Sequence, residues 1–177
     1  MVRRDVPFLV MTFVGCAGAQ ATTGVVEEAS GPQNVCQRDP AFEQFDFWLG
    51  DWSVYDLDGA LQGTNRITKQ EAGCLVLEQW RSVKGTTGQS YNFYDPVRQK
   101  WRQVWVSRGM SIDYEGGLRD DGTMELVGEI HYHSGRSARF RGEWSQQTDG
   151  SVRQHFEEYD AETETWKPWF TGIYRRQ

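Results

Sequence analysis

The sequence predicts an all-β protein: an antiparallel, up-and-down β-barrel of about ten strands with a short N-terminal helix. The 177 residues are 14% aromatic and include 19 glycines but only 5 prolines, a composition that favours β-structure over a helical bundle. From residue 50 onwards, short runs are separated by turn signals, and several runs alternate apolar and polar residues with a period of two. An open β-sandwich is the alternative, but closure into a barrel removes the exposed sheet edges.

The first 21 residues have the layout of a secretory signal peptide. Arg3-Arg4 gives a basic start, residues 6–15 are apolar, and Ala19-Gln20-Ala21 fits the cleavage pattern. Cys16 and the three residues before it also resemble a bacterial lipobox, in which Cys16 would be lipidated. Soluble export to the periplasm or the extracellular space is the preferred interpretation, and a lipoprotein or a disordered tail are the alternatives. No apolar run reaches the length of a transmembrane helix.

Residues 22–40 show no periodicity and are interpreted as a linker that leads to a barrel domain over 41–177. Without Cys16, the chain keeps two cysteines, Cys36 and Cys74. In an oxidising compartment two thiols more often form a disulfide than a catalytic pair. We therefore expect a bridge between the end of the linker and the barrel, with two unrelated buried thiols as the alternative.

The helix is expected over residues 40–49, where Phe45, Trp48 and Leu49 share one side of at most two turns. Nine turn signals then separate ten runs, and links this short join neighbouring antiparallel strands. Pro168 lies inside the last run and should mark a bulge or an unpaired position. The turn signals are Asp58-Gly59, Glu71-Ala72-Gly73, Gly85-Thr86-Thr87-Gly88, Asp95-Pro96, Arg108-Gly109, Asp120-Asp121-Gly122, Ser134-Gly135, Thr148-Asp149-Gly150 and Ala161–Glu164.

The alternation assigns one mainly apolar and aromatic face of the strands to the barrel interior, and a charged face to the outside. A barrel of this size can hold one small ligand, so the inward face is where a site is expected. The inward residues are Val76, Glu78, Trp80, Asn92, Trp101, Gln103, Trp105, Ile112, Tyr114, Leu126, Ile130, Phe140, Trp144, Gln154, Phe156 and Phe170.

Five inward residues are polar, and each buried polar group without a partner costs about 1–3 kcal/mol. Two explanations stay open: a structural hydrogen-bond network with buried water, or a wet cavity that orients a ligand. The polar inward residues are Glu78, Asn92, Gln103, Tyr114 and Gln154. The candidate ligand-binding residues are Glu78, Trp80, Asn92, Gln103, Trp105, Tyr114, Trp144, Gln154 and Phe170.

Glu78 is the only carboxylate in the inward set. Burial against Trp80 and Trp105 would raise its pKa and suit it to act as an acid or a base, with Tyr114 as a second catalytic candidate. The favoured interpretation is a salt bridge between Glu78 and an arginine near the rim of the barrel.

The segment Phe47-Trp48-Leu49-Gly50-Asp51-Trp52 resembles the start of a lipocalin or related calycin barrel. That superfamily carries Gly-x-Trp after a short helix, and a basic residue at the end of the last strand that stacks on the tryptophan. Gly50-Asp51-Trp52 and Tyr174-Arg175-Arg176 match both features. Residues 44–52 are more closely similar to secreted bacterial proteins of lipocalin-like type that have no established activity. The resemblance implies that Gly50, Trp52 and Arg175 determine the fold.

Other chemistries receive little support. His131 and His133 share a strand face, but alternation places that face outside and no third metal ligand is evident, and His155 also alternates outward. Arg136, Arg139 and Arg141 form a short basic stretch in a chain of net charge −6, so no nucleic-acid partner is expected. No cofactor or metal is predicted, and the sequence carries no signal for an oligomeric state.

The leading hypothesis is therefore binding or carriage of a small, partly apolar molecule inside the barrel. The second is an enzyme, an isomerase, cyclase or hydrolase of small organic molecules. The third is a filled barrel that acts through its surface as a structural or interaction protein. A membrane partner is expected only if Cys16 carries a lipid.

Overall fold

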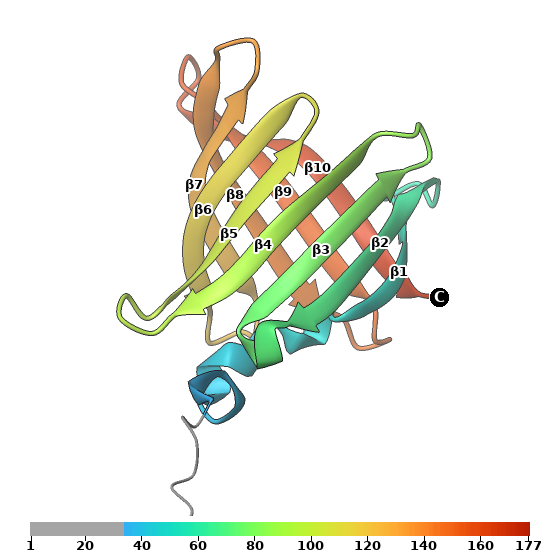
Figure 1. Cartoon of the computed structure of the whole chain (residues 1–177). Helices are drawn as coiled ribbons and strands as arrows, with labels where there is room; N and C mark the ends of the chain where they lie inside the picture. Colours follow the sequence, from blue (N-terminus) through green and yellow to red (C-terminus); the bar gives the residue numbers. More distant parts are fainter. Residues whose placement is uncertain (1–33) are drawn as a thin grey trace, which may run out of the picture. The chain divides into compact units, whose positions relative to one another are not determined.

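Residues 34–177, the part of the chain that the computed structural model describes, contain ten antiparallel strands that close into one up-and-down barrel (Figure 1). Each strand pairs with its neighbours in sequence, and the first strand pairs with the last. The predicted fold class is confirmed, and so is a break at each of the nine turn signals. The strands are β1 (Gly50–Tyr55), β2 (Leu61–Gln70), β3 (Leu75–Ser82), β4 (Thr87–Asp95), β5 (Lys100–Ser107), β6 (Met110–Leu118), β7 (Met124–Tyr132), β8 (Ser137–Gln146), β9 (Val152–Asp160) and β10 (Thr165–Arg176).

The expected short helix before β1 is confirmed, and it takes the form of 3-10 helices within residues 40–48. It consists of η2 (Pro40–Glu43) and η3 (Asp46–Trp48), and a further 3-10 turn, η1 (Val35–Gln37), lies in the predicted linker. Isolated helices this short are only marginally stable in water, so tertiary packing decides their geometry. Here the break between η2 and η3 allows Phe45 and Trp48 to be fully buried side by side, with ring centroids 5.0 Å apart.

The predicted disulfide between Cys36 and Cys74 is confirmed. It joins η1 to the 3-10 turn η4 (Glu71–Gly73), which links β2 to β3, and the Asn34 amide also donates to the Ala72 carbonyl over 2.6 Å. The described end of the predicted linker is therefore anchored to the barrel. The predicted signal peptide, Cys16 and the rest of the predicted linker lie outside the described residues.

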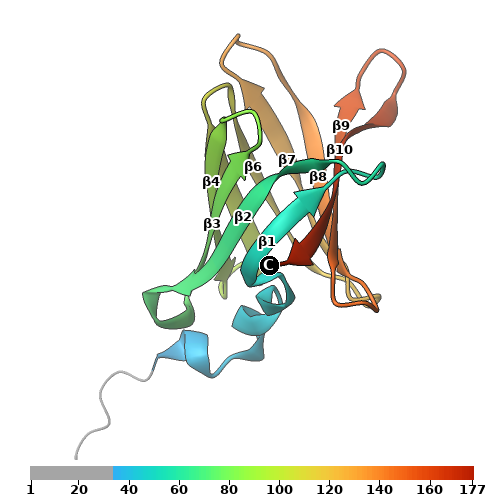
Figure 2. The same cartoon turned by 90° about the vertical axis from the view of Figure 1, so that its right-hand side faces the viewer.

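The 3-10 segments gather at one end of the barrel (Figure 2). Trp48 and Phe45 fill that end together with the inward Trp101 and Trp144, and Trp52 donates its indole N–H to the Trp48 carbonyl over 2.8 Å. Large buried aromatic side chains in mutual contact contribute strongly to a core. This end of the barrel is closed.

A basic residue stacks on Trp52, but it is Arg176 and not the expected Arg175. The guanidinium of Arg176 lies 4.5 Å from the Trp52 ring centroid, whereas Arg175 lies over Tyr55. The reason is strand parity: Tyr174 is buried inside, so Arg176 shares its side of the strand and Arg175 points outward. Gly50 has a φ of 138°, and a Cβ there would lie 2.6 Å from Arg176.

Strand β10 contains an irregularity at the predicted proline position. Its register against β9 shifts between Pro168 and Phe170, which leaves Trp169 as the extra residue, so the expected bulge is confirmed. Among residues 34–177, no helix is both long enough and apolar enough to cross a bilayer.

Candidate ligand-binding cavity

A cavity of about 450 Å³ occupies the half of the barrel away from the 3-10 segments. Its deepest lining residues are mainly polar, the next residues along the same strands are mainly aromatic, and the β3–β4 and β5–β6 connections form the rim. The cavity is lined by Glu78, Trp80, Thr86, Thr87, Gln103, Trp105, Ser107, Arg108, Gly109, Met110, Ile112, Tyr114, Gln154, Phe156, Trp169, Phe170 and Tyr174.

Glycines on the wall keep the lumen open. A Cβ at Gly88 would lie 2.1 Å from the Trp105 ring, and one at Gly63 would lie 2.6 Å from the Trp80 ring. Phe156 over Gly142 and Phe170 over Gly172 repeat the arrangement, at 2.7 and 2.8 Å. Four aromatic rings thus pack against glycine backbone, at positions where a Cβ atom would clash with them.

Replacing Gly88 with alanine is expected to displace the Trp105 ring towards the lumen and to destabilise the barrel by about 1–3 kcal/mol through overpacking. Urea unfolding measures the free-energy change, and near-ultraviolet circular dichroism reports the displaced indole. Gly117→Ala is the matched control, because no atom of residues 34–177 outside its chain neighbours lies within 4 Å of its Cβ position. Equal behaviour of the two variants would show that the ring does not depend on Gly88.

Glu78, on β3, is 3% exposed at the deep end of the cavity. Its carboxylate accepts hydrogen bonds from the Ser90 hydroxyl at 2.6 Å and from the Asn65 amide at 2.7 Å. Burial raises the pKa of Glu78 to about 7, because the loss of hydration outweighs these two hydrogen bonds. The expected salt bridge to an arginine is wrong for the described residues, since the partners that β2 and β4 place beside Glu78 are neutral.

A chain of hydrogen bonds runs from Glu78 around the barrel. The Asn92 amide donates to the Ser90 hydroxyl and to the Val76 carbonyl, both at 2.9 Å. Gln103 donates to the Asn92 side-chain oxygen, and the Tyr114 hydroxyl donates to the side-chain oxygen of Gln103. The structural network that the sequence left open therefore exists beside the cavity.

The network continues on the other side of Glu78. Asn65 also donates to the Tyr174 hydroxyl at 3.2 Å, and Tyr174 donates to the Gln154 side-chain oxygen at 2.7 Å. Burial, with the negative charge of Glu78, holds the pKa values of Tyr114 and Tyr174 well above the ordinary range, so both remain donors. Gln154 lines the cavity, and its amide nitrogen donates to no acceptor among the described residues.

Seven of the nine candidate ligand-binding residues line the cavity, both catalytic candidates included. Asn92 lies behind Gln103 in the network, and Trp144 belongs to the closed end, 5.3 Å from the Phe45 ring. Asn65 lies outside the predicted inward set, but the period-two burial of residues 61–70 on β2 is a signal that identifies it. The lining or network residues that sequence reasoning missed are Asn65, Thr86, Thr87, Ser90, Ser107, Arg108, Gly109, Met110, Trp169 and Tyr174.

Trp169 stands at the rim because of the bulge in β10. Its indole N–H donates to the Tyr132 hydroxyl at 3.2 Å, and Tyr132 donates to Glu158. Arg136 pairs with Glu158, lies 4.0 Å from the Tyr132 ring centroid, and lowers the pKa of Glu158. These contacts hold the indole of Trp169 beside the mouth of the cavity.

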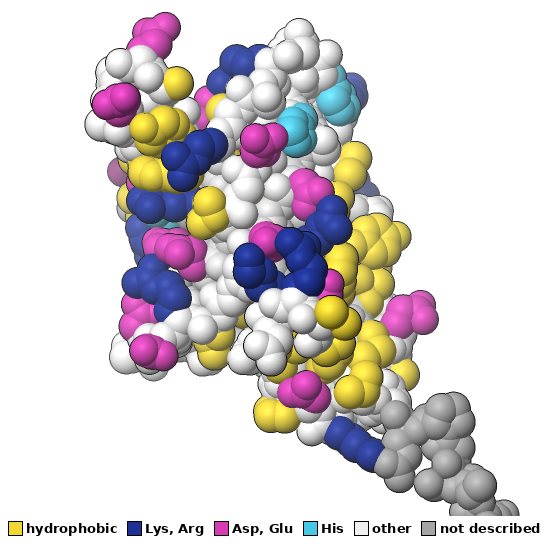
Figure 3. All heavy atoms as spheres, turned by 90° about the vertical axis from the view of Figure 1, so that its left-hand side faces the viewer, with side chains coloured by type: hydrophobic (Ala, Val, Ile, Leu, Met, Phe, Trp, Pro, Cys, Tyr) yellow, Lys and Arg dark blue, Asp and Glu magenta, His cyan; other side chains and the backbone are white. Residues whose placement is uncertain are grey.

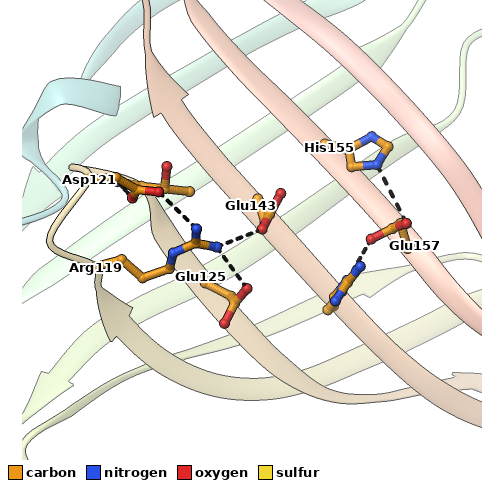
Figure 4. A network of polar contacts seen from close by, with 8 residues as sticks. Arg119, Asp121, Glu125, Glu143, His155 and Glu157 are labelled. Carbon is orange, nitrogen blue, oxygen red and sulfur yellow. Dashed lines mark hydrogen bonds and ion pairs between the residues drawn. The ribbon is translucent and has the colours of Figure 1, made fainter. Parts of the chain in front are cut away.

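The outer face carries paired charges. Acidic and basic side chains mix on the face shown in Figure 3. Figure 4 shows Arg119 between Asp121, Glu125 and Glu143, with nitrogen–oxygen distances of 2.8, 3.2 and 3.0 Å. These side chains are partly exposed, so they lie on a solvated surface, as the alternation predicts. Exposed pairs of this kind contribute little to stability.

The histidines lie away from the cavity lining. His155 contacts the Thr171 hydroxyl at 2.7 Å and lies 3.8 Å from Glu157, and His131 lies 3.7 Å from Glu129. Within residues 34–177 no three His, Cys, Asp or Glu side chains group in a way that could hold a metal ion.

No protein-family model matches the chain, and a search of curated proteins finds no match either. The closed ten-stranded barrel is consistent with the lipocalin-like architecture that the Gly50-Asp51-Trp52 segment resembles. The functional argument therefore depends on the geometry of the cavity.

Proposed function

We propose that this protein binds or carries a small, partly apolar molecule inside its barrel. The observation that supports this most is a lumen of about 450 Å³, in whose wall aromatic rings pack against glycines. Small-molecule pockets typically have volumes of about 300–1,000 Å³, apolar walls and a few well-placed polar groups. A filled barrel would instead place side chains in this volume.

The proposal extends to the family and the compartment. A lipocalin-like barrel that opens at one end suits a carrier of small molecules, since the strands enclose one ligand. The Cys36–Cys74 disulfide fits an oxidising compartment, in agreement with the signal peptide predicted over residues 1–21. We propose a periplasmic or extracellular protein, soluble or lipidated at Cys16.

Replacing Ile112 with tryptophan should fill the lumen and weaken binding of the neutral dye N-phenyl-1-naphthylamine at least tenfold. Ile112 is 2% exposed and lines the cavity, so the larger side chain takes the space of a ligand. Dye fluorescence, which rises in an apolar environment, measures the affinity. Ser111→Trp is the control. Ser111 is next to Ile112 on β6 but its side chain points out of the barrel, so this substitution should leave dye binding unchanged. Absence of dye binding by the unsubstituted protein would contradict the proposal.

A further inference from the structure

Glu78 lies in a setting that favours a positive charge beside it. The carboxylate is 3% exposed, lines the cavity, and forms no ion pair with any basic side chain among the described residues. Buried carboxylates in proteins are normally paired with a cation or bound to a metal, because an isolated buried charge is costly. Glu78 is therefore a buried carboxylate in the cavity lining that no basic side chain of the described residues neutralises.

The hydrogen-bond directions agree with an ionised Glu78. Ser90 and Asn65 both donate to the carboxylate, and Ser90 in turn accepts from Asn92, so these donors point towards Glu78. The Asn65 side-chain oxygen is buried and has no donor among the described residues, which adds a second electron-rich atom near the carboxylate. This arrangement stabilises negative charge and attracts a cationic donor.

The walls above Glu78 suit the same kind of ligand. Trp80 and Trp105 line the cavity beside Glu78, with Phe156 and Phe170 on the facing strands. Aromatic faces carry negative potential, attract organic cations and pack against flat apolar groups. Among the described residues that line the cavity, Arg108 is the only basic one. It belongs to the β5–β6 connection, which places it at the rim and away from Glu78.

We propose that the cavity binds a small organic amine in its protonated form, with the ammonium group on Glu78 and the apolar body between the aromatic walls. This inference rests on the proposed function and specifies the chemical class of the ligand. A carboxylate ligand is the main rival, since its charge would be repelled by Glu78 but attracted by Arg108 at the rim.

Three compounds with one indole body separate these classes: tryptamine is a cation, tryptophol is neutral and indolepropionate is an anion. Isothermal titration calorimetry of the full chain at about pH 8 measures each affinity. We expect tryptamine to bind at least tenfold more tightly than tryptophol, and indolepropionate to bind most weakly. In Glu78→Gln, the preference for tryptamine should disappear while tryptophol binds within about twofold of its original affinity.

The unsubstituted protein decides the question even if Glu78→Gln does not fold. Equal affinity for tryptamine and tryptophol overturns the amine proposal, and so does tight binding of indolepropionate that is lost in Arg108→Gln. If N-phenyl-1-naphthylamine binds while the tryptamine preference is absent, only the amine proposal fails. If neither the dye nor any indole compound binds, the proposed function fails with it.

Discussion

Replacing Trp48 with alanine is expected to lower the free energy of unfolding by about 3–5 kcal/mol, the cost of removing a large aromatic side chain from a packed core. Trp48 is fully buried, and its ring centroid lies 5.0 Å from that of Phe45, 5.6 Å from that of Trp144 and 6.2 Å from that of Tyr174. Removing it leaves a void in the closed end that its rigid neighbours cannot fill. Urea unfolding followed by circular dichroism measures the loss.

Two controls define what Trp48 contributes. Trp169→Ala removes the same side chain from the exposed rim and should cost less than about 2 kcal/mol. Trp48→Phe should also be mild, since the Trp48 indole N–H is buried without a partner among the described residues and its removal offsets part of the lost packing. A Trp48→Ala cost below that of Trp169→Ala would mean that η3 is not part of the cooperative core.

Most of the fold could be predicted from the sequence because it depends on local signals. Turn chemistry located the breaks between strands, and the period of two placed Glu78 and Trp105 inside. The 3-10 geometry of residues 40–48 could not be predicted in this way, because packing of Phe45 and Trp48 against the barrel decides it. The stacking of Arg176 on Trp52 was within reach of the alternation, because Arg176 has the same parity as the inward Phe170 and Tyr174 and the bulge lies before Phe170; the expectation for Arg175 came from the resemblance alone.

The candidate site was predictable only in part, since its decisive features depend on pairing between strands. Gly88 was assigned to a turn, whereas it belongs to β4, where the Trp105 ring covers it. The partners of Glu78 depend on register with β2 and β4, which brings Asn65 and Ser90 to it instead of an arginine. Alternation gives the face of a residue, but only the register between strands gives its neighbours.

Replacing Glu78 with glutamine is expected to change how stability depends on pH. The pKa of Glu78 rises from 4.5 in the unfolded chain to about 7 in the barrel, so the folded state binds the extra proton between these values. The free energy of unfolding of the unsubstituted protein should therefore fall by about 3 kcal/mol as the pH rises through this window. Glutamine does not titrate, so over the same rise in pH the free energy of unfolding of the variant should increase by about this amount relative to that of the unsubstituted protein. Urea unfolding at a series of pH values measures the difference.

Glu115→Gln is the matched control, because the Lys100 hydrogen bond lowers the pKa of Glu115 and moves its titration to more acidic pH. Its stability difference from the unsubstituted protein should stay flat from about pH 5 to 8. A flat difference for Glu78→Gln as well would mean that water in the cavity hydrates the carboxylate fully. A bound ammonium favours the ionised form of Glu78, so saturating tryptamine should also flatten the fall of the unfolding free energy of the unsubstituted protein with pH. The same urea titration, repeated with tryptamine, therefore tests whether the ligand places a positive charge beside Glu78.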